Sequence, residues 1–286
     1  MRRLAEVGVR PAAWRSGRIV AAFWWDGHPN FGDDLTPWLL PRYGLIPVLR
    51  SPSSAQLSGV GSIVEFLPET FAGAVWGSGL MEERPRSLPH ATVLAVRGHH
   101  TRDLLDAPAS VALGDPGLLI SRHLPRPSVR WELALVPHGH HRDHPGLAGL
   151  VARGGDRVRV VNVHQRAQHA ARHIAACRAV ITTSLHGLVT ADAYGIPAVW
   201  TVLDPPLGGG DFKFRDYESV VSPGRTRFLE FSDDLSVDDI LRAAWSVNAD
   251  LVSRAGDELE RALARVPDVI APLPAFPSGV PRTLRG

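Results

Sequence analysis

The chain has 286 residues, of which 44% are apolar and 21% charged, values that argue against a disordered or membrane-embedded chain. This length suits two domains of about 130–150 residues each. The formal net charge is only +2 and the sequence has no long basic run, so we expect no nucleic acid as a partner. The single cysteine, Cys177, excludes an internal disulfide.

The N-terminal residues lack the apolar core of a signal peptide, and no apolar run approaches the ~18 residues that a spanning helix needs. We therefore expect a cytoplasmic protein. Superficial contact with the inner face of the membrane stays open.

The first half of the chain contains short apolar runs that end in glycine, aspartate or arginine. Buried parallel strands that lead into polar loops have this pattern. These predicted strands are residues 18–25, 73–79, 91–98 and 110–117. A stretch interrupted by prolines follows at residues 121–130, and we place a domain boundary after residue 125.

The second half alternates strands with helices, which is typical of βαβ units and predicts parallel sheets. The predicted strands are residues 131–139, 158–164, 179–184 and 198–203, and the predicted helices are residues 164–178, 185–195 and 236–266. We therefore expect an N-terminal acceptor-side domain (1–125), a C-terminal donor-side domain (126–268) and a proline-rich tail (269–286).

The predicted fold class is α/β, with two Rossmann-like domains whose parallel sheets face a central cleft. Parallel sheets of this kind bind ligands at the carboxyl ends of their strands. The polar clusters described next follow predicted strands, so we expect them at the cleft.

A histidine begins the helix that follows the predicted strand 179–184. Ser184 is a candidate N-cap, and Leu185, His186 and Gly187 form the first turn. Free N–H groups there favour an anion, and the positive end of the helix dipole lowers the pKa of His186 unless an anion is bound. Gly187 would let a ligand approach the backbone. We interpret His186 as a proton carrier, with a purely structural histidine as the alternative.

A second cluster lies at residues 28–40, between a predicted strand and a helix. Asn30 and Gly32 offer a hydrogen-bonding group and close backbone approach, and Asp33 could accept a proton from a sugar hydroxyl. An equally good interpretation is that Asp33 or Asp34 only caps the helix. The glycine turn with Gly77 and Ser78 is weaker evidence for phosphate binding, because it lacks the P-loop lysine.

Residues 208–219 begin with three glycines and then carry Lys213 and Arg215, so we predict a mobile charged loop. Lys213 is the only lysine among the 31 basic residues. Either this ammonium was kept for a purpose that an arginine would not serve, or it is a chance survivor.

The histidine-rich segment 138–144 suggests metal binding. His138, His140, Asp143 and His144 resemble a metallo-β-lactamase pattern, but the last two ligands come one residue too late to share its geometry. A metallohydrolase is therefore the less favoured interpretation.

Five segments, in this order, resemble the polysaccharide pyruvyl transferase family, particularly its shorter exopolysaccharide-associated members. They are NFGDDL, VWGSGL, AVRGHHTRDLL, ALGDP and SLHGLVTADAYGIP, within residues 20–220. The resemblance implies a fold similar to that of GT-B glycosyltransferases. It also implies transfer of pyruvate from phosphoenolpyruvate onto a glycan or lipid-linked sugar as a ketal, without a metal or cofactor.

This chain departs from the family in one position, since many members have arginine directly before LHG where Ser184 stands here. The positive charge must then come from Arg97, Lys213 and Arg215. We expect His186 as the catalytic acid and Asp33 as the base. The residues expected to bind substrates are Asn30, Gly32, Gly77, Ser78, Arg97, His138, Ser184, Leu185, Gly187, Lys213 and Arg215. A nucleotide-sugar glycosyltransferase and an inactive scaffold of the same fold stay open as alternatives.

Overall fold

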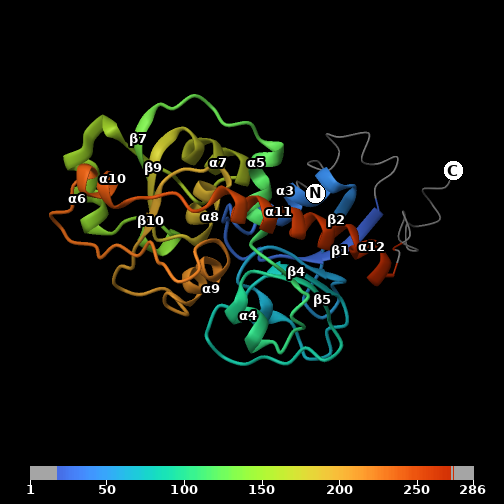
Figure 1. The fold of residues 1–286 in the computed structure, drawn as a ribbon. Coiled ribbons are helices and arrows are strands. Elements are labelled where there is room, and N and C mark those ends of the chain that lie inside the picture. The colour runs from blue at the N-terminus through green and yellow to red at the C-terminus, as the bar shows by residue number, and fades with distance from the viewer. Residues whose placement is uncertain (1–17, 272, 274–286) are drawn as a thin grey trace.

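Two parallel β-sheets with flanking helices form the protein, whose computed structural model describes residues 18–271 and 273 (Figure 1). The first sheet has the order β2-β1-β3-β4-β5-β6, and every neighbouring pair is parallel. Its strands are β1 (Arg18–Phe23), β2 (Leu45–Leu49), β3 (Leu57–Ser58), β4 (Ala74–Ser78), β5 (Thr92–Val96) and β6 (Ala112–Leu113). The helices of this half are α3 (Leu35–Leu39), α4 (His99–Leu104) and α5 (Ile120–His123).

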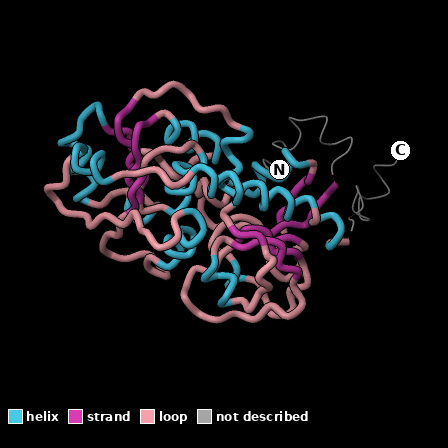
Figure 2. Tube along the Cα trace, viewed as in Figure 1, coloured by secondary structure: helices cyan, strands magenta, loops and turns pink. Residues whose placement is uncertain are grey.

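The second sheet has the order β10-β9-β7-β8 and is also parallel. Figure 2 shows the strands of the two sheets as two separate groups. Its strands are β7 (Trp131–Val136), β8 (Val158–Val160), β9 (Cys177–Thr182) and β10 (Ala198–Trp200). The remaining helices are α6 (Pro145–Gly154), α7 (Ala167–Ala175), α8 (Leu185–Ala193), α9 (Phe212–Val221), α10 (Val237–Ala243), α11 (Ala249–Ala264) and α12 (Val266–Val269). The expected α/β class with two parallel sheets is confirmed.

Three expectations about individual elements need correction. The predicted helix 236–266 is two helices, α10 and α11, because the chain between them bridges Trp245 to Ala198 of β10. Residues 212–221, expected in a loop, form α9. Strands β2 and β3 did not appear among the predicted strands.

Each sheet has a point at which its strand order reverses. In the first sheet this point lies between β1 and β3, and in the second between β7 and β9. Loops that leave the two strands at such a point run in opposite directions and open a crevice, which is where ligands bind in open parallel sheets. The segments that follow β1, β3, β7 and β9 are therefore the first place to look for a site.

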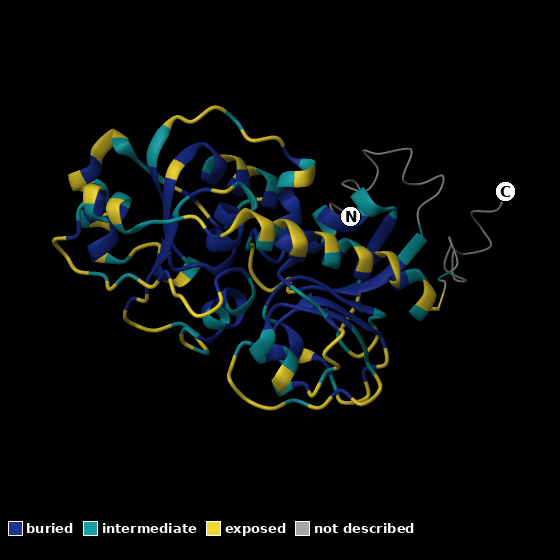
Figure 3. Ribbon diagram, viewed as in Figure 1, coloured by how far each residue is buried: buried dark blue, intermediate teal, exposed yellow. Residues whose placement is uncertain are grey.

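Helix α11 returns from the second half of the chain to the first sheet, along which it lies in Figure 1. Its inner face buries Leu259 and Leu263 in one cluster with Val20 and Trp76. In Figure 3 the long helix α11 alternates between buried and exposed turns. The indole Nε1 of Trp76 also donates to the carbonyl of Leu259 at 2.9 Å. Burial of such side chains stabilises the fold by about 1.5–3 kcal/mol each. The last helices thus tie the two halves together.

The domain limits at residues 125 and 268 stay a prediction, and most of the predicted tail 269–286 lies outside the described residues. No helix in the described part of the chain is long and apolar enough to cross a membrane.

Candidate active site

The turn Asn30–Asp33 follows β1 and rests against the second half of the chain. The side chain of Asn30 accepts a hydrogen bond from the amide of Gly32 at 3.1 Å, which folds the turn. The amide of Phe31 donates to the carbonyl of Val163 at 2.8 Å. These two bonds place Gly32 at the beginning of α8, where a Cβ on this residue would overlap with the ring of His186. Glycine is required here by close approach of a side chain.

Asp33 is buried beside this contact and does not cap a helix. The residue before α3 is Asp34, whose carboxylate accepts the amide of Ala167 at 2.8 Å and so caps α7 instead. Asp33 is 8% exposed, and its Oδ1 lies 3.0 Å from the position that a Cβ on Gly61 would take. Burial raises the pKa of Asp33 to about 7, aided by Asp34 and Asp115, while Asn30 and Lys213 act in the opposite direction. A carboxyl with this pKa exchanges protons near neutral pH.

His186 lies at the second position of α8, between the two halves of the chain. Its Nε2 is 3.6 Å from Oδ2 of Asp115, and within the described residues neither of these buried atoms has a hydrogen-bond partner. Burial lowers the pKa of His186, and the nearby Asp115 only partly offsets this effect. The free protein therefore holds a neutral imidazole with an unused nitrogen. Buried polar atoms in proteins are nearly always hydrogen-bonded, so this pair of atoms is a candidate contact for a ligand or a proton.

Asp115 was not among the residues expected in the site, although it belongs to the ALGDP segment. It follows β6, and its Oδ1 accepts the amide of Gly117 at 2.8 Å, which begins the turn Pro116–Leu119. The signal that could have identified it is an aspartate almost directly after a short apolar strand, β6.

The charge of Lys213 acts on titratable side chains from both halves of the chain. Lys213 projects from α9, and its charge acts on Asp33, His138 and His186. Burial and the neighbouring Arg97 lower the pKa of Lys213 to about 8, and Asp33 partly opposes this. The structure gives this ammonium no hydrogen-bond partner among the residues it describes. Lys213 is thus a half-buried cation that is available to an anionic ligand.

Helix α9 is held from both sides, which fixes where Lys213 points. Toward the first sheet, Asp216 accepts bonds from Arg97 at 2.9 Å and from the Thr101 amide at 2.8 Å. Toward the second, the Tyr217 hydroxyl donates to Asp192 at 2.8 Å, and Glu218 accepts from Arg227 at 2.9 Å. The chain of charged residues after the three glycines is therefore an anchored helix, with polar side chains on its buried face.

Arg97 does not occupy the position expected of a substrate-binding residue. It is 0% exposed, and its guanidinium bonds to Asp216, to Ser62 Oγ at 2.6 Å and to the carbonyl of Leu80. Those partners come from the protein itself, so Arg97 holds α9 against the first sheet and acts on the site through its charge.

The expected glycine turn is also used for packing. The hydroxyl of Ser78 is buried and bonds to Ser58 at 2.9 Å and to the carbonyl of Gly59. Gly77 has a φ of 76°, and a Cβ there would overlap with the ring of Pro116. The close approach that requires this glycine is made by a proline of the protein, so the turn offers no phosphate site.

The other residues expected to bind substrate near His186 have structural or surface positions. Ser184 stands at the N-cap position of α8 without a side-chain capping bond, and Leu185 packs in the core of the second half. A Cβ on Gly187 would meet Thr182 and Val136, so this glycine allows α8 to pack on its sheet. Arg215 lies at the surface, where it pairs with Glu83 at 2.7 Å and Asp211 at 3.1 Å. It is not part of the buried cluster.

His138, expected at the cleft, follows β7 and is half-buried. Burial lowers its pKa to about 3, with a further contribution from Lys213, so its ring is neutral. Its Nδ1 accepts the amide of His140 at 3.3 Å, and Nδ1 of His144 accepts the amide of Gly146 at 3.2 Å. The two rings thus cap the turn Gly139–His141 and the helix α6. No group of three ligands suited to a metal is found in the described ranges 18–271 and 273. The geometry therefore does not favour the metallohydrolase interpretation.

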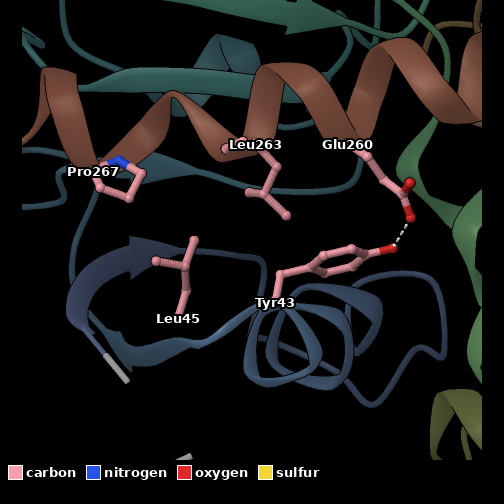
Figure 4. Close-up of a pocket in the computed structure, with 6 residues that line it drawn as sticks. Tyr43, Leu45, Glu260, Leu263 and Pro267 are labelled. Atoms are coloured by element: carbon pink, nitrogen blue, oxygen red, sulfur yellow. Dashed lines mark hydrogen bonds between the residues drawn. The ribbon is translucent and has the colours of Figure 1, made fainter. Parts of the chain in front are cut away.

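One cavity lies away from this cluster. It has a volume of about 190 Å³ between the start of β2 and α11, and Tyr43 bonds to Glu260 at its edge at 2.7 Å (Figure 4). A far smaller hollow, lined among others by Thr183, Gly210 and Phe214, lies next to Ser184 and Lys213 in the sequence. This hollow has room for about one water molecule, and none of the four residues Asp33, Asp115, His186 and Lys213 lines it.

The comparisons with known proteins agree with the resemblance expected from the sequence. A family model described as polysaccharide pyruvyl transferase matches residues 66–205. The succinoglycan biosynthesis protein ExoV of Rhizobium meliloti (strain 1021) is 27% identical over 70% of this chain and 64% of its own length. An uncharacterised protein, L143 of Acanthamoeba polyphaga mimivirus, is 26% identical over 65% of this chain and 69% of its own. This chain thus spans about two thirds of each relative.

Two solved structures are similar at 15% identity. One is an uncharacterised protein of Klebsiella pneumoniae, with a TM-score of 0.45 over 79% of this chain and 98% of that one. The other is the glycosyltransferase SnogD of Streptomyces nogalater, with a TM-score of 0.44 over 75% and 73%. Because both scores are low, the fold assignment above rests on the two sheets themselves.

Proposed function

We propose that this chain, in which residues 66–205 match the polysaccharide pyruvyl transferase family, moves pyruvate from phosphoenolpyruvate onto a sugar of a cell-surface or exopolysaccharide precursor. The similarity to a succinoglycan biosynthesis protein supports a polysaccharide precursor as the acceptor. The observation that carries the proposal is the cluster of Asp33, Asp115, His186 and Lys213. Asp33 and His186 follow β1 and β9 at the strand-order reversals, Asp115 follows β6 at the edge of the first sheet, and Lys213 comes from α9.

Phosphoenolpyruvate fits the charges of this cluster. Lys213 is a cation without a hydrogen-bond partner in the described chain, and the amides of Leu185 and His186 open α8, where the helix dipole favours an anion. An anionic ligand beside His186 also raises the pKa of the imidazole and so converts it into an acid when substrate binds. Because Asp33, Asp115 and His186 are all buried, substrate entry requires a movement of the chain around them.

The reaction needs one proton donor and one proton acceptor. His186 gives a proton to the methylene carbon of the enol, and the adjacent carbon takes on oxocarbenium character. A sugar hydroxyl attacks that carbon and loses its proton to Asp33, and the bond between that carbon and the phosphate oxygen breaks. A second hydroxyl closes the ketal, and its proton leaves with the released phosphate. The scheme uses no metal or cofactor, and fixed charges in a closed site are its larger source of rate.

The test is incubation with phosphoenolpyruvate and a panel of glycan acceptors, read by phosphate release and by a mass gain equal to pyruvate minus water. His186→Ala should lower turnover at least about 100-fold. His140→Ala is the control, because that side chain is exposed and only its backbone amide is bonded. Near-wild-type transfer by His186→Ala would remove this histidine from the mechanism.

A thermal-shift experiment separates this function from that of a nucleotide-sugar glycosyltransferase. Phosphoenolpyruvate alone should raise the melting temperature of the full chain, whereas uridine or guanosine diphosphate sugars should not. The opposite result would favour the glycosyltransferase.

A further inference from the structure

Two exposed aromatic rings stack on each other at the carboxyl end of the first sheet. Trp25 is 38% exposed and Phe66 is 41% exposed. Their ring centroids are 5.0 Å apart and their planes are inclined by 24°. Phe23 supports Phe66 from below with an edge-on contact at 6.3 Å. The pair is therefore held in place on one side and open to solvent on the other.

The chain around Trp25 is built to keep this ring in position. A Cβ on Gly27 would come within 2.6 Å of the indole, so a larger residue there would displace the ring. Contiguous exposed apolar surface on a protein often marks a binding site. Stacking covers one face of each ring at most, which leaves an apolar platform at the surface.

The platform and Asp33 are formed by the same two segments. Phe23 of β1 is the register partner of Ser58 of β3, so the two strands end side by side. The segment after β1 carries Trp25 and then Asp33. The segment after β3 carries Gly61, on which a Cβ would come within 3.0 Å of Oδ1 of Asp33, and then Phe66. This is also the point at which the strand order of the first sheet reverses, where ligands bind in such sheets.

We infer that Trp25 and Phe66 form a binding platform for a saccharide ring of the acceptor. One face of a pyranose carries several C–H bonds whose hydrogens are slightly positive, and they pack well on the negative face of an aromatic ring. The platform binds one sugar unit and directs the hydroxyls of that unit or of its neighbour toward Asp33. The inference rests on the proposed function only in naming this saccharide the acceptor.

The closing experiment measures saccharide binding and transfer separately on the full chain. Binding is read on an array of immobilised bacterial oligosaccharides and polysaccharides, and transfer by the acceptor KM with phosphoenolpyruvate. Trp25→Ala and Phe66→Ala should weaken saccharide binding and raise the acceptor KM about tenfold or more. Trp25→Phe and Phe66→Tyr should retain most of both. The thermal shift caused by phosphoenolpyruvate should be the same in all variants.

Phe228→Ala is the matched control, because Phe228 is 43% exposed but lies on the second half, where it packs against Trp200. A wild-type protein that binds no saccharide on the array would overturn the inference. Unchanged binding and acceptor KM in Phe66→Ala would overturn it too, while leaving the proposed function intact. Ring-dependent saccharide binding without any response to phosphoenolpyruvate would instead retain the platform and reject pyruvyl transfer.

Discussion

Gly32 and His186 are 154 positions apart in the chain, yet the backbone of one touches the imidazole of the other. A Cβ on Gly32 would overlap with Nδ1 of the ring. The contact joins the turn after β1 to the start of α8 and so defines the site between the halves. It also explains the glycine of the NFGD segment without reference to backbone dihedrals, since φ at Gly32 is not positive.

Gly32→Ala should therefore displace the His186 ring and lower turnover about 100-fold, the loss expected when a catalytic group is misplaced. The free energy of unfolding should fall by about 1–3 kcal/mol, as for an overpacked core position. Gly149→Ala in α6 is the control, because its nearest neighbour is the flexible end of Arg153 at 3.1 Å. Kinetics and urea unfolding check both values, and wild-type turnover in Gly32→Ala would contradict the close contact.

Lys213 gives the site a predictable pH dependence. The kcat/KM for phosphoenolpyruvate reports ionisations of the free enzyme. Asp33, with a pKa of about 7, must be ionised to act as the base, and Lys213, with a pKa of about 8, must be protonated to attract the anion. Because His186 must also carry a proton and its pKa is lowered in the free protein, we expect kcat/KM to stay level up to about pH 7, to decline above it, and to show a steeper falling limb near pH 8.

Replacement of the lysine tests the falling limb. Lys213→Arg should move this limb to higher pH, because a guanidinium stays charged. Lys213→Met should raise the KM for phosphoenolpyruvate about tenfold or more and abolish the limb. Arg215→Met is the control, since Arg215 lies at the surface and pairs with Glu83 and Asp211. A Lys213→Met profile identical to that of the wild type would exclude the ammonium from donor binding.

Asp216 should contribute strongly to stability, because it is buried and accepts three bonds from Arg97 and Thr101. Asp216→Ala leaves the Arg97 charge buried without its partner and should cost about 3–5 kcal/mol of unfolding free energy. Asp211→Ala, at the residue directly before α9, removes only a surface pair with Arg215 and should change the free energy of unfolding by about 0.5 kcal/mol or less. Equal unfolding midpoints for the two variants in urea would show that the buried pair does not anchor α9.

The sequence predicts the sheets well because buried parallel strands are continuous apolar runs. Strands such as β7 and β9 have this property, with four to five buried residues each. Strand β2 is interrupted by Pro47, and β3 has only two residues, so neither produces a clear pattern. Helix α9 was missed because its buried face carries Asp216 and Glu218. From the sequence alone these carboxylates are expected at the surface, because their buried partners Arg97 and Arg227 lie far away in the chain.

The same limitation applies to the candidate site. The positions after strands predict that Asp33 and His186 come near one another, since this depends on topology alone, and Gly32 next to Asp33 indeed lies against the ring of His186. Which polar groups are free depends on side-chain partners far away in sequence. Arg97 and Ser78 follow their strands as expected, but their polar atoms bond to the protein. Asp115, like Asp33, lies in a segment that follows a strand, and only the packing of α8 identifies it as the neighbour of His186.

Asp33 lowers the stability of the fold in a pH-dependent way. Its pKa is about 7 in the folded protein and near 3.8 when unfolded, so the folded state binds more protons between these values. The stability contributed by this group therefore falls as the pH rises from about 4 to 7 and stays low above pH 7.

Asp33→Asn removes this cost and should raise the free energy of unfolding at pH 8 by about 1–3 kcal/mol, with little change below pH 4. It should also lower pyruvyl transfer at least about 100-fold. Asp143→Asn, at an exposed carboxylate, should change neither quantity. Urea unfolding from pH 4 to 8 measures the difference, and a pH-independent difference would mean that Asp33 is ionised throughout.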